Sequence, residues 1–197
     1  AILRATGQIP ALPGDPVLFG ELSLSGEVRP VRGSIAAGLD IPGPFVCHPD
    51  HAADIAAMGG TAYGVRTLAE MAGTLTAAAP AVADTAPPSL DFRDIRGVPS
   101  TVADALVEAA RTRRPVILRG PPGCGKTMLA ARLPGLLPPL TDDEGREVAR
   151  VHDVAGLRAP GSTVARPFRA PHHSVSAAGL VGGANLRPGE ASLAHKG

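Results

Sequence analysis

The clearest short-range pattern near the start of the chain is an alternation of polar and apolar residues. Residues 21–24 and 28–31 both alternate, and Ser-Gly-Glu lies between them. Alternation on both sides of a glycine-containing turn is typical of a β-hairpin. Beyond it, the pattern predicts four further elements, namely a helix over 34–39, a buried strand over 45–47, a helix over 51–58 after an Asp50 N-cap, and a helix over 68–75. We therefore predict a small α+β domain over residues 1–76.

A segment of small residues and prolines, residues 77–90, follows this domain and has almost nothing to bury. We interpret it as a linker to a second domain over residues 91–197. That domain shows a helical pattern over 100–112, a β-branched apolar run over 115–119 and a second helical pattern over 128–133. The expected order around the second helix is strand, glycine-rich loop, helix.

The glycine-rich loop carries the chemistry. It matches the pattern G-x-x-x-x-G-K-[ST] in full, through Gly120, Pro121, Pro122, Gly123, Cys124, Gly125, Lys126 and Thr127. Glycines allow backbone N–H groups to turn inward around phosphates, and the following helix points its positive end at them. Lys126 is expected to reach the β- and γ-phosphates of ATP, and Thr127 to place its hydroxyl on Mg²⁺. Cys124 stands at a variable position of the motif.

Charge is distributed unevenly although the net charge is only +1. Residues 1–75 hold four Arg against seven acids, whereas residues 91–197 hold thirteen Arg and two Lys against ten acids. A basic second part could face nucleic acid or nucleotide, or it could be an ordinary solvated surface.

Several features bear on location and completeness. Two cysteines, Cys47 and Cys124, are too few for a disulfide framework, which favours a reducing compartment. No run approaches the roughly 20 apolar residues of a membrane span, and no signal peptide opens the chain, so we expect a cytoplasmic protein without membrane contact. Because the chain starts at Ala1 rather than Met and stops at Gly197 without a helix cap, we expect it to be truncated at both ends.

The hairpin segment, residues 20–31, resembles that of Lon-type protease domains. Lon peptidases use a Ser–Lys dyad, but no lysine precedes Lys126, and the arginine at position 32 cannot act as a base. The resemblance therefore implies an inactive Lon-like domain. His48 and His51 could ligate a metal, although capping or surface roles are the simpler interpretation.

Residues 91–97 resemble the segment with which AAA+ ATPases wrap adenine, with Ile95 in apolar contact and Gly97 allowing close backbone approach. Residues 132–140, 166–174, 180–183 and 187–195 are similar to magnesium-chelatase-like AAA+ proteins. Together with the Lon-like start, the chain resembles the YifB/ComM family. The resemblance implies an α/β P-loop NTPase, the N-terminal half of an AAA+ core, and a homo-oligomeric ring, a hexamer, that hydrolyses ATP. No Walker B acid or arginine finger is assignable, so we name no catalytic residue.

A pair of adjacent histidines, His172 and His173, lies in a part that resembles a family insertion projecting toward the ring's pore. With Arg169, these residues could contact the substrate, or the loop could be purely structural. We expect His152 and Asp153 to be structural.

Three functions follow from these resemblances. The first is a motor acting on single-stranded or branched DNA, in recombination or transformation. The second is a motor that couples ATP hydrolysis to metal insertion into a porphyrin, which the Lon-like start argues against. The third is an ATP-dependent peptidase, which the missing lysine argues against.

Overall fold

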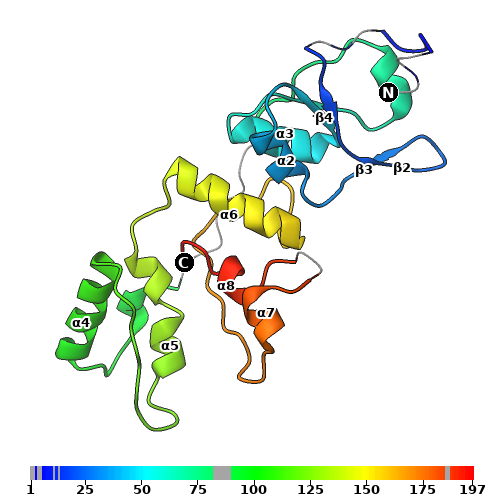
Figure 1. Cartoon of the computed structure of the whole chain (residues 1–197). Coiled ribbons are helices and arrows are strands. Elements are labelled where there is room, and N and C mark those ends of the chain that lie inside the picture. Colours follow the sequence, from blue (N-terminus) through cyan, green and yellow to red (C-terminus); the bar gives the residue numbers. More distant parts are fainter. Residues whose placement is uncertain (1–2, 4–5, 11, 13, 82–89, 185–186) are drawn as a thin grey trace.

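A small parallel sheet organises the first part of the chain in the computed structural model (Figure 1). The structure describes residues 3, 6–10, 12, 14–81, 90–184 and 187–197. Three strands pair in the order β1-β4-β5, namely β1 (Val17–Leu18), β4 (Phe45–Cys47) and β5 (Ala62–Gly64). Both pairings are parallel, with Phe45 opposite Val17 on one side and Ala62 on the other. The strand predicted over 45–47 is confirmed.

Helices cover this sheet and complete its core. They are α2 (Ser34–Asp40), α3 (Pro49–Ala57) and the 3₁₀ helix η1 (Leu68–Ala72). Phe45, Ile35 and Ile55 form one buried cluster, because an entirely buried strand lies against the apolar sides of two helices. The predicted helix over 68–75 is wrong in type and length, since only a 3₁₀ helix forms and it ends before Gly73.

The start of α3 also differs from the prediction. Pro49 occupies the first turn, where a missing N–H costs nothing, and His48 rather than Asp50 is the N-cap. Its Nδ1 atom accepts a hydrogen bond from the Asp50 N–H at 3.4 Å. The capping role is therefore confirmed for His48.

The predicted hairpin is confirmed as β2 (Glu21–Leu22) and β3 (Val28–Arg29), an antiparallel pair. The Ser23 side chain accepts a hydrogen bond from the Glu27 N–H at 3.0 Å and so fixes the turn. The resemblance of this hairpin segment to Lon-type protease domains stays a prediction.

The predicted linker falls mainly on residues 82–89, which lie outside the described residues. Its first residues still contact the sheet, because Ala77 bridges Tyr63 and the Ala78 N–H donates to the Ala62 carbonyl at 2.8 Å.

Residues 91–197 are helical wherever the structure describes regular elements. The helices are η2 (Phe92–Asp94), α4 (Ser100–Arg111), α5 (Lys126–Ala130), η3 (Leu133–Leu136), α6 (Asp142–Ala155), α7 (Ala177–Val181) and α8 (Glu190–Leu193). The strand predicted over 115–119 is wrong, since these residues pair with no other strand in the described part of the chain. A β-branched sequence forms a strand only where a partner completes its backbone hydrogen bonds, and the Ile117 side chain is 94% exposed. The parallel sheet with its helices nevertheless fits an α/β class.

Helix α6 joins the two parts of the chain (Figure 1). Near its end, Asp153 accepts hydrogen bonds from the Ile35 and Ala36 N–H groups at 2.9 and 3.2 Å, so it caps α2. Arg150 pairs with Asp40 at 2.7 Å. Because both contacts connect α6 to α2, the helix packs directly on the first part of the chain.

A buried ion pair reinforces this junction. Arg158 lies 3.1 Å from Asp54 of α3, and the two side chains are 7% and 2% exposed. The same carboxylate accepts from the Gly161 N–H at 3.1 Å. The segment after α6 is therefore held against α3.

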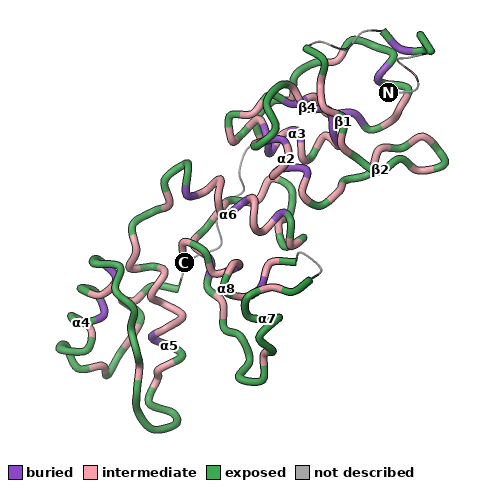
Figure 2. Tube along the Cα trace, in the orientation of Figure 1, coloured by how far each residue is buried: buried purple, intermediate pink, exposed green. Residues whose placement is uncertain are grey.

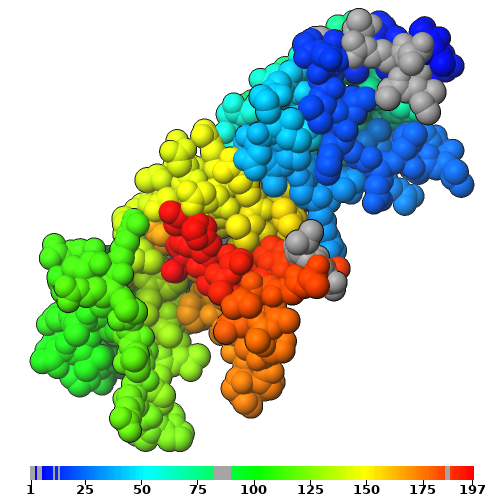
Figure 3. Space-filling view, viewed as in Figure 1, coloured from blue at the N-terminus to red at the C-terminus, as the bar shows by residue number. Residues whose placement is uncertain are grey.

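Burial is uneven along the molecule (Figure 2). Buried residues gather around the small sheet, whereas the lower part of the view is mostly exposed. In Figure 3 the molecule is elongated, with the first 75 residues at one end and α4 and α5 at the other. The candidate site lies at that exposed end.

Candidate nucleotide-binding site

The loop of residues 120–127 turns sharply into α5 at the lower end of Figure 1. Gly123 and Gly125 have φ values of +81° and +85°, which L side chains rarely adopt. Gly125 is the N-cap of α5, and its carbonyl accepts from the Leu129 N–H at 2.9 Å. The spacing of the glycines in the sequence therefore matches the two places where the backbone needs them.

Lys126 closes the loop. Its Nζ donates hydrogen bonds to the carbonyls of Gly120 at 2.9 Å and Pro121 at 2.6 Å, and Nζ lies 3.6 Å from Cys124 Sγ. The ammonium is therefore held inside the loop by backbone oxygens.

The remaining loop positions are open to a ligand. Pro121, Pro122, Gly123 and Cys124 are exposed, and a Cβ added at Gly123 would meet no atom within 4 Å. A Cβ added at Gly120 would lie 2.9 Å from Cys124 Sγ, so the exposed Cys124 side chain would have to move. Thr127 lies in the first turn of α5 and is exposed. An exposed loop with a lysine ammonium, a hydroxyl and unobstructed backbone fits a phosphate group with its divalent cation.

Residues 91–97 dock at the far end of α5 rather than at the loop. The Asp91 side chain caps η2 by accepting from the Arg93 N–H at 2.8 Å. Ile95 is half-buried, and Gly97 has a φ of +77° with open space around it. Arg132, two residues after the end of α5, donates a hydrogen bond to the Asp91 carbonyl at 3.1 Å.

A separate groove of about 590 Å³ lies between α4, η3 and residues 166–169. Apolar side chains such as Val116, Leu133 and Phe168 line it, with Arg113 and Arg166 among the charged ones. Among the described residues, none of 120–127 lines this groove. This groove is therefore separate from the candidate phosphate-binding loop.

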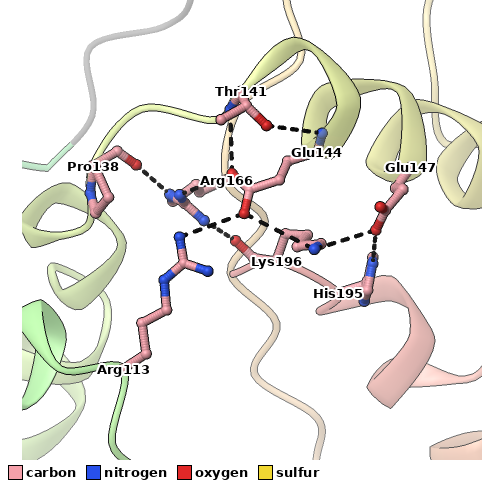
Figure 4. A network of polar contacts seen from close by, with 8 residues as sticks. All are labelled: Arg113, Pro138, Thr141, Glu144, Glu147, Arg166, His195 and Lys196. Atoms are coloured by element: carbon pink, nitrogen blue, oxygen red, sulfur yellow. Dashed lines mark hydrogen bonds and ion pairs between the residues drawn. The ribbon is translucent and has the colours of Figure 1, made fainter.

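A charged network beside this groove was missed by sequence reasoning (Figure 4). Glu144, in the first turn of α6, faces Arg113 at 3.5 Å, Arg166 at 3.6 Å and Lys196 at 3.9 Å. The Thr141 N–H donates to Glu144 and lowers the pKa of this carboxyl, and the three cations lower that pKa further. The Thr141–Glu144 capping box is readable from sequence, but the three cations come from distant positions that no spacing connects.

The end of the chain is held against α6 by neighbouring contacts. Glu147 lies 2.7 Å from His195 and 3.4 Å from Lys196, and the His195 hydrogen bond lowers the pKa of Glu147. His152 contacts the Leu193 carbonyl through Nε2 at 3.1 Å. The structural interpretation of His152 agrees with this contact, and that of Asp153 agrees with its hydrogen bonds to the start of α2.

The three residues predicted to contact substrate lie in different surroundings. Arg169 forms a two-pronged pair with Glu190, at 2.6 and 2.7 Å, and Glu190 raises the pKa of the guanidinium. His172 and His173 are exposed, with ring centroids 4.0 Å apart, and His172 Nδ1 lies 2.7 Å from the Ser174 hydroxyl. The histidines are therefore accessible, whereas the guanidinium of Arg169 is engaged within the chain.

No group of three or more His, Cys, Asp or Glu side chains is arranged to hold a metal ion in the described part of the chain. His51, the second histidine considered as a ligand, has a buried Nδ1 atom without a hydrogen-bond partner. Of the helices that the structure describes, none has the length and apolar character needed to cross a bilayer.

Comparison with known proteins identifies the protein family of this chain. The family model described as magnesium chelatase, subunit ChlI, matches residues 91–197, and this match together with the parallel sheet and its helices fits an α/β P-loop fold. Because the match covers more than half of the chain, this protein belongs to the magnesium-chelatase-like family, with relatives named YifB and ComM.

Three relatives illustrate the similarity. An uncharacterized protein of Mycobacterium tuberculosis is 44% identical over 201 residues, or 92% of this chain and 39% of its own. The uncharacterized protein YifB of Salmonella typhimurium is 35% identical over 214 residues, or 100% of this chain and 41% of its own. Competence protein ComM of Haemophilus influenzae is 47% identical over 111 residues, or 55% of this chain and 22% of its own. The chain thus spans about two fifths of the length of the first two relatives.

Proposed function

We propose that this chain binds ATP with Mg²⁺ at residues 120–127, as the nucleotide site of an ATPase. The observation that carries the proposal is the loop itself, in which Gly123 and Gly125 have positive φ and the Lys126 ammonium is held by the Gly120 and Pro121 carbonyls. The family match over residues 91–197 supports it independently. A loop with these features is suited to phosphate groups, because backbone N–H groups and an ammonium can share their charge.

Each residue has a separate role in this proposal. Lys126 would contact the β- and γ-phosphates, and the Thr127 hydroxyl would hold Mg²⁺, which offsets phosphate charge. Ile95 would contact the adenine, and Gly97 would let the backbone approach it. Hydrolysis also requires a carboxylate and an arginine that we assign to no residue of this chain.

The test uses the two lysines of the chain. Lys126→Ala should weaken binding of a fluorescent ATP analogue by more than about tenfold, because charge-assisted contacts to phosphate are lost. Lys196→Ala is the matched control, since it removes the same charge from the Glu144 network. Equal affinity of wild type and Lys126→Ala would refute the assignment.

We further propose that the whole protein acts on DNA as a homo-hexameric ring. The relative from Haemophilus influenzae is named a competence protein, which supports work on single-stranded or branched DNA. His172 and His173 are accessible and would contact the strand, whereas Arg169, paired with Glu190, would hold the base of their loop.

The family description favours one competing function, a motor for metal insertion into a porphyrin. Phosphate release by the whole protein separates the two. Stimulation by single-stranded or branched DNA supports the first function, and stimulation by porphyrin with a chelatase subunit supports the second.

We do not propose a peptidase. The first lysine of the chain is Lys126, and the Ser34 hydroxyl is buried and donates to the Val31 carbonyl at 2.5 Å. A serine so engaged, without a lysine base beside it, is not an activated nucleophile.

A further inference from the structure

Arg132 occupies a junction that the nucleotide motif does not include. It lies two residues after Ala130, the last residue of α5, and is the N-cap of η3; its own N–H donates a hydrogen bond to the Leu129 carbonyl at 3.1 Å. Arg132 therefore lies between α5, which begins at Lys126, and η3.

The guanidinium of Arg132 bridges two backbone carbonyls. Its Nη1 group donates a hydrogen bond to the Met128 carbonyl at 3.2 Å, within α5. Its Nε group donates a hydrogen bond to the Asp91 carbonyl at 3.1 Å, 41 residues earlier in the chain. A planar guanidinium can hold two acceptors in fixed directions, whereas an ammonium is a point charge on a flexible stem. The contact therefore fixes Asp91 relative to α5.

A close backbone approach beside this bridge gives a second constraint. A Cβ added at Gly135, in η3, would lie 3.1 Å from the Leu90 carbonyl. Contacts this short leave little room for any side chain. Residues 90 and 91 are thus held at two neighbouring points by the segment that follows α5.

The constraint extends to the residues proposed to contact adenine. Asp91 caps η2 with its side chain while its carbonyl is held by Arg132. The Ile95 N–H then donates to the Phe92 carbonyl at 3.2 Å, so Ile95 follows directly from η2. The position of Ile95 relative to α5 depends on the Arg132 bridge.

We propose that Arg132 is a positioning residue that sets the base-binding segment against the phosphate-binding helix, so that it contributes to recognition of adenosine and not of phosphate. This inference depends on the proposed nucleotide site. It predicts that loss of Arg132 weakens binding of ATP while leaving binding of tripolyphosphate unchanged.

The experiment measures both ligands by calorimetry, with Mg²⁺, on the same chain. Arg132→Met should lower ATP affinity about tenfold, the effect of losing one charge-assisted hydrogen bond, and should not change tripolyphosphate affinity. Arg132→Lys keeps the charge but not the fork, and should recover only part of the ATP affinity. Arg111→Met is the matched control, because it removes the same charge from the exposed end of α4.

Gly135→Ala is a second variant that keeps every charge. It should show the same selective loss, because the added methyl group pushes against the Leu90 carbonyl. It also keeps the inference testable if Arg132→Met fails to fold, as judged by circular dichroism.

The outcomes distinguish the two levels of the proposal. If wild type binds neither ATP nor tripolyphosphate, the nucleotide site itself is wrong. If wild type binds both and the folded Arg132 or Gly135 variants lose both equally, or lose neither, the positioning role is overturned.

Discussion

Replacing Arg158 by Met tests the junction between the first part of the chain and the segment after α6. The change removes the guanidinium that lies 3.1 Å from the Asp54 carboxylate and keeps most of the apolar stem. Asp54 then stays buried and, among the residues that the structure describes, keeps the Gly161 N–H as its hydrogen-bond donor. A buried carboxylate without its cation is costly because water cannot replace the lost partner.

The size of the expected loss in unfolding free energy depends on how deeply the ion pair is buried. Removing one partner of a buried ion pair costs about 3–5 kcal/mol of unfolding free energy, against about 0–1 kcal/mol for an exposed pair. Here the side chains are 7% and 2% exposed, and the Gly161 hydrogen bond offsets part of the loss. We therefore expect a decrease of about 3 kcal/mol, which is a large share of the usual total of about 5–15 kcal/mol.

Urea unfolding followed by circular dichroism measures this decrease. Arg146→Met is the control, because its pair with Asp143 is 39% and 87% exposed and its loss should cost less than about 1 kcal/mol. A cycle with Asp54→Asn should give a double variant that is more stable than the sum of the single effects predicts. If Arg158→Met costs no more than Arg146→Met, or if the cycle is additive, the buried pair does not hold the junction.

Two further predictions concern buried titratable groups. Cys124 is exposed and Cys47 is buried, where burial raises the thiol pKa to about 12, so a thiol reagent should label only Cys124 in the native chain and both after denaturation. Fast native labelling of Cys47 would contradict its burial. Burial also lowers the pKa of His51, although Asp153 and Asp54 act to raise it. As pH falls, His51 therefore takes up its proton at a higher pH in the unfolded state than in the folded state. The stability that depends on neutral His51 should be retained above about pH 6.5 and lost as pH falls through the lowered folded-state pKa. Urea unfolding between about pH 7.5 and 5.5 should show a smaller decrease in the free energy of unfolding for His51→Gln than for wild type.

Local patterns predicted the elements that depend on neighbours in sequence. The hairpin over residues 21–29, the strand over 45–47 and the helix over 100–111 follow from alternation, an apolar run and helical periodicity. The proposed nucleotide loop could be identified from sequence for the same reason, since all its groups lie within eight consecutive residues, 120–127.

Features that depend on distant partners were not predicted. Residues 115–119 have strand-forming side chains, but strand formation also needs a neighbouring strand that the segment itself cannot supply. Asp153 caps α2 across 118 positions of sequence, and no local pattern connects them. Arg132 reaches Asp91 in the same way, so its role became visible only in the structure.

Helix α6 contacts the first part of the chain at one end and the segment before residues 120–127 at the other. Its last turns hold α2 through Asp153, and its first turn holds Arg113 through Glu144, just before the segment that leads into the nucleotide loop. A 14-residue helix is about 21 Å long and stiff, so its two ends cannot shift independently without breaking one of these contacts. The first part of the chain is therefore connected through α6 to Arg113, which precedes the proposed nucleotide loop. If nucleotide binding displaces the segment after Arg113, the displacement must either strain the Glu144 network or carry α6 and the small sheet with it.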